Sequence, residues 1–139
     1  MFYHILVPVD FAETNRHALD IAVGLAGQSD GQISVLHVIE LIADTRVEEL
    51  KDFYALLEQQ ARESMEGLLA PYRAQLADIS THIVYGHRVR DIVRFASNGE
   101  VDLIVLNSHR IDPNDPTQGW GTISYKVGIL AQCPVMLVK

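Results

Sequence analysis

Residues 101–138 read VDLIVLNSHRIDPNDPTQGWGTISYKVGILAQCPVMLV, and this stretch decides the fold. It opens with the continuous apolar run 103–106, which predicts a strand buried on both faces of a parallel sheet. The chain then turns polar at residues 107–110 and passes two prolines before Gly121-Thr122, where a helix can begin. A second apolar strand follows at residues 135–138. The predicted order is therefore strand, polar loop, short helix, strand.

A strand end, a glycine-containing loop and a helix N-terminus in this order are typical of an anion-binding site. The N–H groups of a first helical turn have no intrahelical partner, and the helix dipole favours negative charge there. The stretch favours phosphate as a ligand, and alone it shows no more than that.

The preceding chain predicts three more strands, at residues 5–9, 32–38 and 80–85. Between them, apolar residues at steps of three and four predict helices over about 14–26, 47–76 and 89–96. Thr45 and Glu48 form a candidate capping box for the second helix, and Pro71 should kink or break that helix near Ala70. The alternation predicts an α/β fold, an open five-stranded parallel sheet that is doubly wound, with helices on both faces.

Length, charge and composition limit the class of protein. The 139 residues fit one domain, residues 1–139, and a net charge of −7 argues against a nucleic-acid partner. The single cysteine, Cys133, excludes an intrachain disulfide and fits a reducing compartment. The N-terminus has no secretory pattern and no apolar run is long enough to span a bilayer. We expect a cytoplasmic protein with no membrane partner.

Ligands of such sheets bind at the carboxyl ends of the strands, where the strand order reverses. For the order 3-2-1-4-5 that crevice lies between the first and fourth strands. The first strand ends in Pro8-Val9-Asp10 and the fourth in Leu106-Asn107-Ser108-His109. Two separate polar groups are thus predicted to converge on one site.

With these residues in view, the chain resembles the universal stress protein family over its whole length. The matching pieces are ILVPVD at residues 5–10, LHVIE at 36–40, Gly86, DLIVLNSHR at 102–110, Gly121-Thr122 and the terminal CPVMLVK. The resemblance implies a small cytoplasmic homodimer with an adenine-nucleotide α-hydrolase-like fold, paired through its C-terminal strand. It also implies a role in stress-response signalling or regulation, with an adenine nucleotide as ligand. ATP is the leading candidate, with Mg²⁺ as a possible companion ion.

In nucleotide-binding members the signature is glycine, two residues, glycine, nine residues, glycine, then serine or threonine. Here Asn107 and Arg110 replace the first two glycines, and ten residues instead of nine separate Arg110 from Gly121. The resemblance assigns nucleotide contacts, from base to phosphates, to these positions: Pro8, Val9, Asp10, Val38, Leu106, Asn107, His109, Arg110, Gly121, Thr122, Ile123 and Ser124. Val9 and Val38 would form the walls of the base pocket, and Gly121 to Ser124 would face the phosphates.

Several of these residues have a second, structural interpretation. Asp10 is equally suited to cap the first helix or bind loop amides, and Arg110 either neutralises phosphate or fills the space of the missing glycine. His109 has no second metal ligand at a recognisable spacing, so no metal site is predicted. Asp112 and Asp115 are candidate Mg²⁺ contacts or solvated turn residues, and Trp120 covers the ligand or packs beneath the loop.

Two functions therefore stay open: an adenine-nucleotide-binding regulator, and a dimeric interaction module whose degenerate pocket binds no nucleotide. No general base stands beside a nucleophile and no Walker-type lysine motif is present, so we expect no enzyme, at most slow incidental ATP hydrolysis. A phosphoacceptor receiver domain is excluded because Asp10 lacks further acidic partners at the end of the third strand. The apolar edge strand 135–138 needs a partner, which a second copy would supply.

Overall fold

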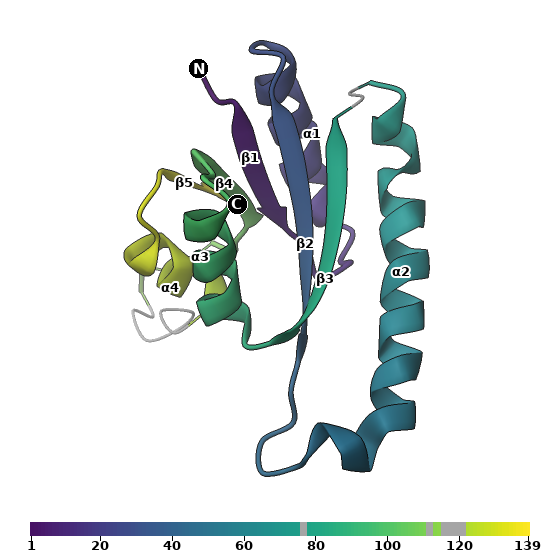
Figure 1. The fold of residues 1–139 in the computed structure, drawn as a ribbon. Helices are drawn as coiled ribbons and strands as arrows, with labels where there is room; N and C mark the ends of the chain where they lie inside the picture. Colours follow the sequence, from purple (N-terminus) through teal and green to yellow (C-terminus); the bar gives the residue numbers. More distant parts are fainter. Residues whose placement is uncertain (76–77, 111–112, 115–121) are drawn as a thin grey trace.

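The computed structural model describes residues 1–75, 78–110, 113–114 and 122–139 of the chain (Figure 1). Within these residues, strands and helices alternate along the chain, as predicted. The elements are β1 (His4–Pro8), α1 (Asn15–Gly27), β2 (Gln32–Glu40), the 3-10 turn η1 (Val47–Leu50), α2 (Lys51–Arg73), β3 (Ile79–Gly86), α3 (Arg88–Asn98), β4 (Leu103–Asn107), α4 (Ile123–Leu130) and β5 (Val135–Val138).

The five strands form one sheet in the order β3-β2-β1-β4-β5, and all four strand pairs are parallel. This confirms the predicted α/β class and strand order. β1 is central because its residues after His4 are apolar and buried on both faces. β5 lies at one edge, paired with β4 from Ile104↔Val135 to Asn107↔Val138, so the predicted edge position of the terminal strand is also confirmed.

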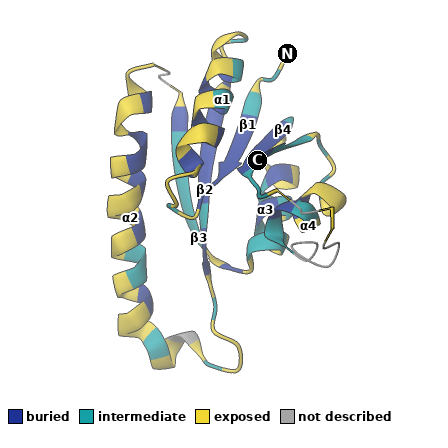
Figure 2. Cartoon of the chain, turned by 180° about the vertical axis from the view of Figure 1, so that it is seen from behind, coloured by how far each residue is buried: buried dark blue, intermediate teal, exposed yellow. Residues whose placement is uncertain are grey.

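Helices cover both faces of the sheet (Figure 1). Because side chains alternate along a strand, neighbouring residues of β1 enter different cores: Ile5 and Val7 pack against α1 and α2, whereas Leu6 packs against α3 and α4. β2 follows the same alternation, and its Leu36 and Val38 belong to the α3–α4 core. α2 presents an exposed outer face and a buried stripe toward the sheet (Figure 2). The fold is thus a sheet between two helical layers.

The start and end of α2 differ from the prediction. Thr45 and Glu48 form no capping box: the Thr45 hydroxyl donates to Ala43 O at 3.4 Å, and α2 begins only after η1 with no side-chain cap. Pro71 does not end the helix near Ala70, because α2 continues to Arg73. The buried Tyr72 holds this last turn against α1, since its hydroxyl donates to the Asp20 carboxylate at 2.7 Å. Tertiary contacts here outweigh the local preference of proline.

β2 is longer than predicted and ends at Glu40 instead of Val38. It pairs with β3 through eight register positions, of which the last is Glu40↔Gly86. The extension brings a carboxylate beyond the end of β1, beside the start of α3. Among the described residues, no helix is long and apolar enough to cross a membrane.

Candidate functional site

A cavity of about 330 Å³ lies at the carboxyl ends of β1, β2 and β4, at the predicted crevice. Its volume is at the lower end of the range for small-molecule sites. The first turns of α1, α3 and α4 close its sides. The described residues that line it are Pro8, Val9, Asp10, Thr14, Asn15, Leu36, Val38, Arg88, Ile92, Leu106, Asn107, Ser108, His109, Thr122, Ile123 and Ser124.

Nearly all of the site residues suggested by the sequence lie together in this lining. Arg110 is the exception among those that the structure describes: it is exposed and does not line the cavity. Gly121 lies outside the described residues, as do Asp112, Asp115 and Trp120, the other candidate ligand contacts of this loop. The structure therefore brings the ends of the first, second and fourth strands together with the start of α4.

The sequence interpretation missed five lining residues: Thr14, Asn15, Leu36, Arg88 and Ile92; Ser108 was expected at the crevice but not among the nucleotide contacts. Leu36 was recoverable from the pattern, because it lies two residues before Val38 and so shares its face of β2. Arg88 was not, because it follows β3, a strand outside the predicted crevice. Its place depends on how far β2 and β3 extend together.

Two asparagines join β1, α1 and β4. The Asn15 side chain, only 2% exposed, accepts from Asp10 N–H at 3.1 Å and donates to the Asn107 amide oxygen at 3.1 Å. Asn107 in turn donates to Thr14 O at 2.6 Å. The amide of Asn107 is thus used on both sides for internal hydrogen bonds. Where the nucleotide-binding signature has glycine, this chain has Asn107, whose side-chain hydrogen bonds join β4 to the start of α1.

The loop after β1 holds Asp10 at the mouth of the cavity. One Asp10 carboxylate oxygen accepts from Ala12 N–H at 3.0 Å, and the residue is exposed. The next residue, Phe11, has φ of 67°, a left-handed conformation that costs a non-glycine residue energy. Its ring packs on His37 with centroids 4.4 Å apart, which stabilises the turn. Asp10 thus accepts a hydrogen bond from a loop amide and is also one of the residues that line the cavity.

His37 supports the floor of the cavity from the other face of β2. Its Nδ1 donates to Val9 O at 2.8 Å. Burial lowers the pKa of His37, the bond to Val9 opposes this, and the positive charge of Arg88 lowers the pKa further. His37 is therefore a neutral hydrogen-bond donor whose pKa responds to a residue of the cavity wall.

The first turn of α4 faces the cavity with hydroxyl groups. Thr122 is the N-cap residue, and the Ser124 hydroxyl lies 2.9 Å from the Ser108 hydroxyl and 3.4 Å from the Thr122 hydroxyl. Ser124 is buried. The unpaired N–H groups of this helical turn, with the helix dipole, favour an anionic group beside these hydroxyls.

His109, just after β4, is held by contacts with Tyr125 and Lys139. The Tyr125 hydroxyl donates to His109 O at 2.8 Å, and the Tyr125 ring meets the His109 ring edge-on, with centroids 5.4 Å apart. The Lys139 ammonium donates to His109 O and to the Tyr125 hydroxyl. The hydrogen bond from Lys139 lowers the pKa of Tyr125. His109 Nε2 is buried and has no hydrogen-bond partner among the described residues. His109 is one of the residues that line the cavity.

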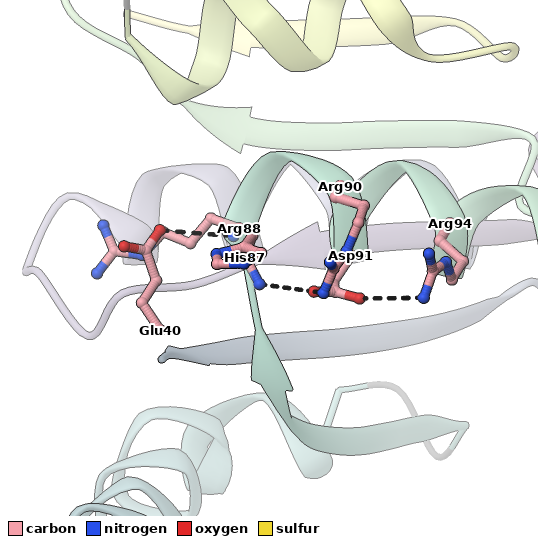
Figure 3. A network of polar contacts seen from close by, with 6 residues as sticks. All are labelled: Glu40, His87, Arg88, Arg90, Asp91 and Arg94. Atoms are coloured by element: carbon pink, nitrogen blue, oxygen red, sulfur yellow. Dashed lines mark hydrogen bonds and ion pairs between the residues drawn. The ribbon is translucent and has the colours of Figure 1, made fainter. Parts of the chain in front are cut away.

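On the opposite side of the cavity, Arg88 begins α3 beside Glu40 (Figure 3). Arg88 Nε lies 3.7 Å from a Glu40 carboxylate oxygen. The helix start is held by Asp91, which accepts from His87 N–H at 2.7 Å and pairs with Arg90 at 3.0 Å. Burial raises the pKa of Asp91, but the bond from His87 and the two neighbouring guanidinium groups together lower it. A Cβ on Gly86 would lie 2.0 Å from an Asp91 carboxylate oxygen, so a larger residue here would displace the Asp91 side chain from the helix start.

The cavity thus combines one apolar side, one hydroxyl- and amide-rich side, and two charged side chains, Asp10 and Arg88, in its described lining. No group of three or more His, Cys, Asp or Glu side chains suited to a metal ion occurs in the part of the chain that the structure describes. A bound divalent cation would therefore depend on ligand phosphates for most of its coordination. The arrangement suits a molecule with an apolar, planar end and an anionic end.

Comparison with known proteins gives a consistent picture. A sequence model of the Universal stress protein family matches residues 1–139. Universal stress protein YxiE of Bacillus subtilis (strain 168) is 26% identical, with 100% of each chain covered. Universal stress protein UspA from Lactobacillus plantarum has a TM-score of 0.78 at 24% identity, covering 99% of this chain and 98% of its own. The universal stress protein from Archaeoglobus fulgidus in complex with dAMP has a TM-score of 0.73 at 20% identity, covering 99% and 98%. These two structural likenesses concern the fold.

Proposed function

This chain belongs to the universal stress protein family. From that premise we propose that the cavity at the strand ends binds an adenine nucleotide, with ATP as the leading candidate, and that the protein acts in the cytoplasm as a regulator of the stress response. One observation carries the proposal: the cavity has an apolar side on β2 and a hydroxyl-rich side at the start of α4. A nucleotide has the same two-ended chemistry. The dAMP complex of the Archaeoglobus fulgidus relative supports the choice of adenine.

The polarity of the cavity orients the proposed ligand. Leu36, Val38 and Ile92 are all buried apolar residues, so the base belongs at their end. The phosphates belong near Thr122 and Ser124, where helical N–H groups and hydroxyls are available. Asp10 then lies close to the ribose hydroxyls or the base edge, as an acceptor for their O–H or N–H groups.

The alternative, an interaction module of the same fold that binds no nucleotide, is favoured by one specific observation. Asn107 uses its amide for Asn15 and Thr14, so it is not free to bind a ligand. In either case we propose a homodimer through β5, because an apolar edge strand such as Val135–Val138 needs a partner. A monomer by sedimentation at micromolar concentration would remove the dimer from both proposals.

We expect any ATP hydrolysis to be slow and incidental. Asp10, the only described carboxylate of the lining, is exposed and engaged with a loop amide. Mg²⁺ would enter with the phosphates, since the described residues offer no cluster of metal ligands. Its chemistry would be charge neutralisation of the phosphate groups.

Calorimetric titration with ATP, with and without Mg²⁺, tests the nucleotide proposal. We expect saturable one-site binding, weakened about tenfold or more in Asp10→Asn, the range for a hydrogen bond to a charged group. Asp52→Asn is the matched control, because Asp52 is an exposed residue of α2 far from the cavity lining. Absence of heat up to millimolar ATP with the wild-type protein would favour the interaction module.

A further inference from the structure

The charges of the cavity are arranged unexpectedly for a nucleotide site. Arg88 is the only lysine or arginine among the described lining residues, and it stands on the β2–β3 side. The hydroxyl-rich start of α4 lies across the sheet, beyond β1, at the end of β4. Arg110, the cation expected near the phosphates, does not line the cavity. Arg88, the only lysine or arginine in the described lining, therefore lies at the apolar β2 end of the cavity.

Arg88 is held at this end by β2. Leu36, Val38 and Glu40 alternate along β2 and share one face, and Glu40 is the residue to which Arg88 is paired. The Arg88 side chain is 42% exposed, and its Nε, not a terminal nitrogen, makes the 3.7 Å contact. Among the described residues the two terminal nitrogens have no hydrogen-bond partner. Figure 3 shows Arg88 and Glu40 side by side at the start of α3.

Glu40 offsets part of the Arg88 charge, because the two groups lie 3.7 Å apart at a partly exposed position. The guanidinium remains a planar, weakly hydrated cation. Such a group stacks well on aromatic rings and bases. Neutralising phosphate would require a cation on the α4 side, at the end of β4, which β2 and β1 separate from β3.

We propose that Arg88 is a specificity-determining residue that covers the base of the bound nucleotide. Its guanidinium stacks on the base, and Val38 and Ile92, which lie beside it in the lining, supply apolar contacts to the same base. The inference rests on the proposed nucleotide function. It adds that the affinity of the site for the base depends on the planar Arg88 cation, which Glu40 positions. If the base contributes much of the binding, adenosine without phosphates should also bind, so adenosine can serve as a probe.

The test compares ATP with adenosine on the wild-type protein, Arg88→Lys and Arg88→Gln. Lysine keeps the charge but loses the plane, so we expect both variants to weaken ATP and adenosine by the same factor, about 5- to 30-fold. Dissociation constants come from calorimetry for ATP and from NMR titration for the weaker adenosine. In the wild type, the Arg88 Nε–H resonance should shift upfield on adding adenosine, because the proton then lies over an aromatic ring.

Arg94→Lys and Arg94→Gln are the matched controls, since Arg94 lies on the same helix, pairs with Asp91 and does not line the cavity. These controls should leave both affinities unchanged, and thermal melts verify that all variants fold. Wild-type affinity in Arg88→Lys, or a loss confined to ATP, would overturn the stacking role while leaving nucleotide binding in place. A wild-type protein that binds neither ATP nor adenosine would overturn the proposed function, and the stacking role with it.

Discussion

The two ends of the cavity are built in different ways. The β2 end consists of Leu36, Val38 and Ile92, apolar side chains that face the α3–α4 core by simple alternation and helical periodicity. The β4 end consists of hydroxyls and amides bonded to one another, such as the Ser108–Ser124 pair at 2.9 Å. The first end is therefore held by burial and the second by a few directional bonds.

This difference teaches where sequence change is tolerated. An apolar wall accepts other apolar residues of similar volume at small cost, since no single contact decides its shape. A hydrogen-bonded wall does not, because each lost partner leaves a buried polar atom unpaired. The departures from the nucleotide-binding signature, Asn107 and Arg110, lie at the end of β4 and just after it. Asn107 is part of the internal network, and Arg110 is exposed and does not line the cavity.

The largest effect should come from removing a side chain at the β2 end. Leu36 is 1% exposed, so Leu36→Ala leaves a cavity in the core and should lower the free energy of unfolding by about 2–5 kcal/mol. Urea unfolding followed by circular dichroism measures the loss. Ile42→Ala, at an exposed residue, is the control and should change stability little. A Leu36→Ala protein as stable as the control would mean that burial does not hold this end.

A smaller effect is expected for the amide bridge. Asn15→Ala leaves Asp10 N–H and the Asn107 amide oxygen without their partner, at a cost of about 1–3 kcal/mol. A double-mutant cycle with Asn107→Ala isolates the bond between the two side chains. Additive losses would show that the asparagines act separately, and the β4 end would then not be a single network.

The smallest effect concerns a titration. Burial is the main cause of the lowered pKa of His37, and Arg88 adds to it. Arg88→Gln should therefore raise the pKa of His37, measurable from ring-proton shifts in NMR, whereas Arg94→Gln should not. The sign for stability follows: a histidine whose folded pKa is below 6.5 gives full stability above that pH and loses it as the pH falls below 6.5. No change in Arg88→Gln would place the guanidinium further from His37 than the structure does.

Much of this molecule follows from local patterns. Continuous apolar runs such as residues 103–106 predicted buried parallel strands, and the order of strand ends predicted the cavity. Arg88 and Glu40 escaped prediction because their meeting depends on the joint length of β2 and β3, which no local pattern fixes. The capping box at Thr45 was wrong because η1 intervenes before α2. The first miss is a tertiary contact that local patterns do not fix, and the second is a local 3-10 turn that replaces the expected helix start.

The hydrogen bond between Asn15 and Asn107 also bears on the order in which the chain folds. The two residues are 92 positions apart in the chain, so their bond closes a long loop that is entropically unfavourable until the intervening strands have docked. β1, α1 and β2 are able to associate much earlier through contacts close in sequence. We therefore expect the cavity to be completed only at the end of folding, after β4 has entered the sheet. Partly folded chains with β4 undocked would then have no ligand site, and the ligand would recognise only finished molecules.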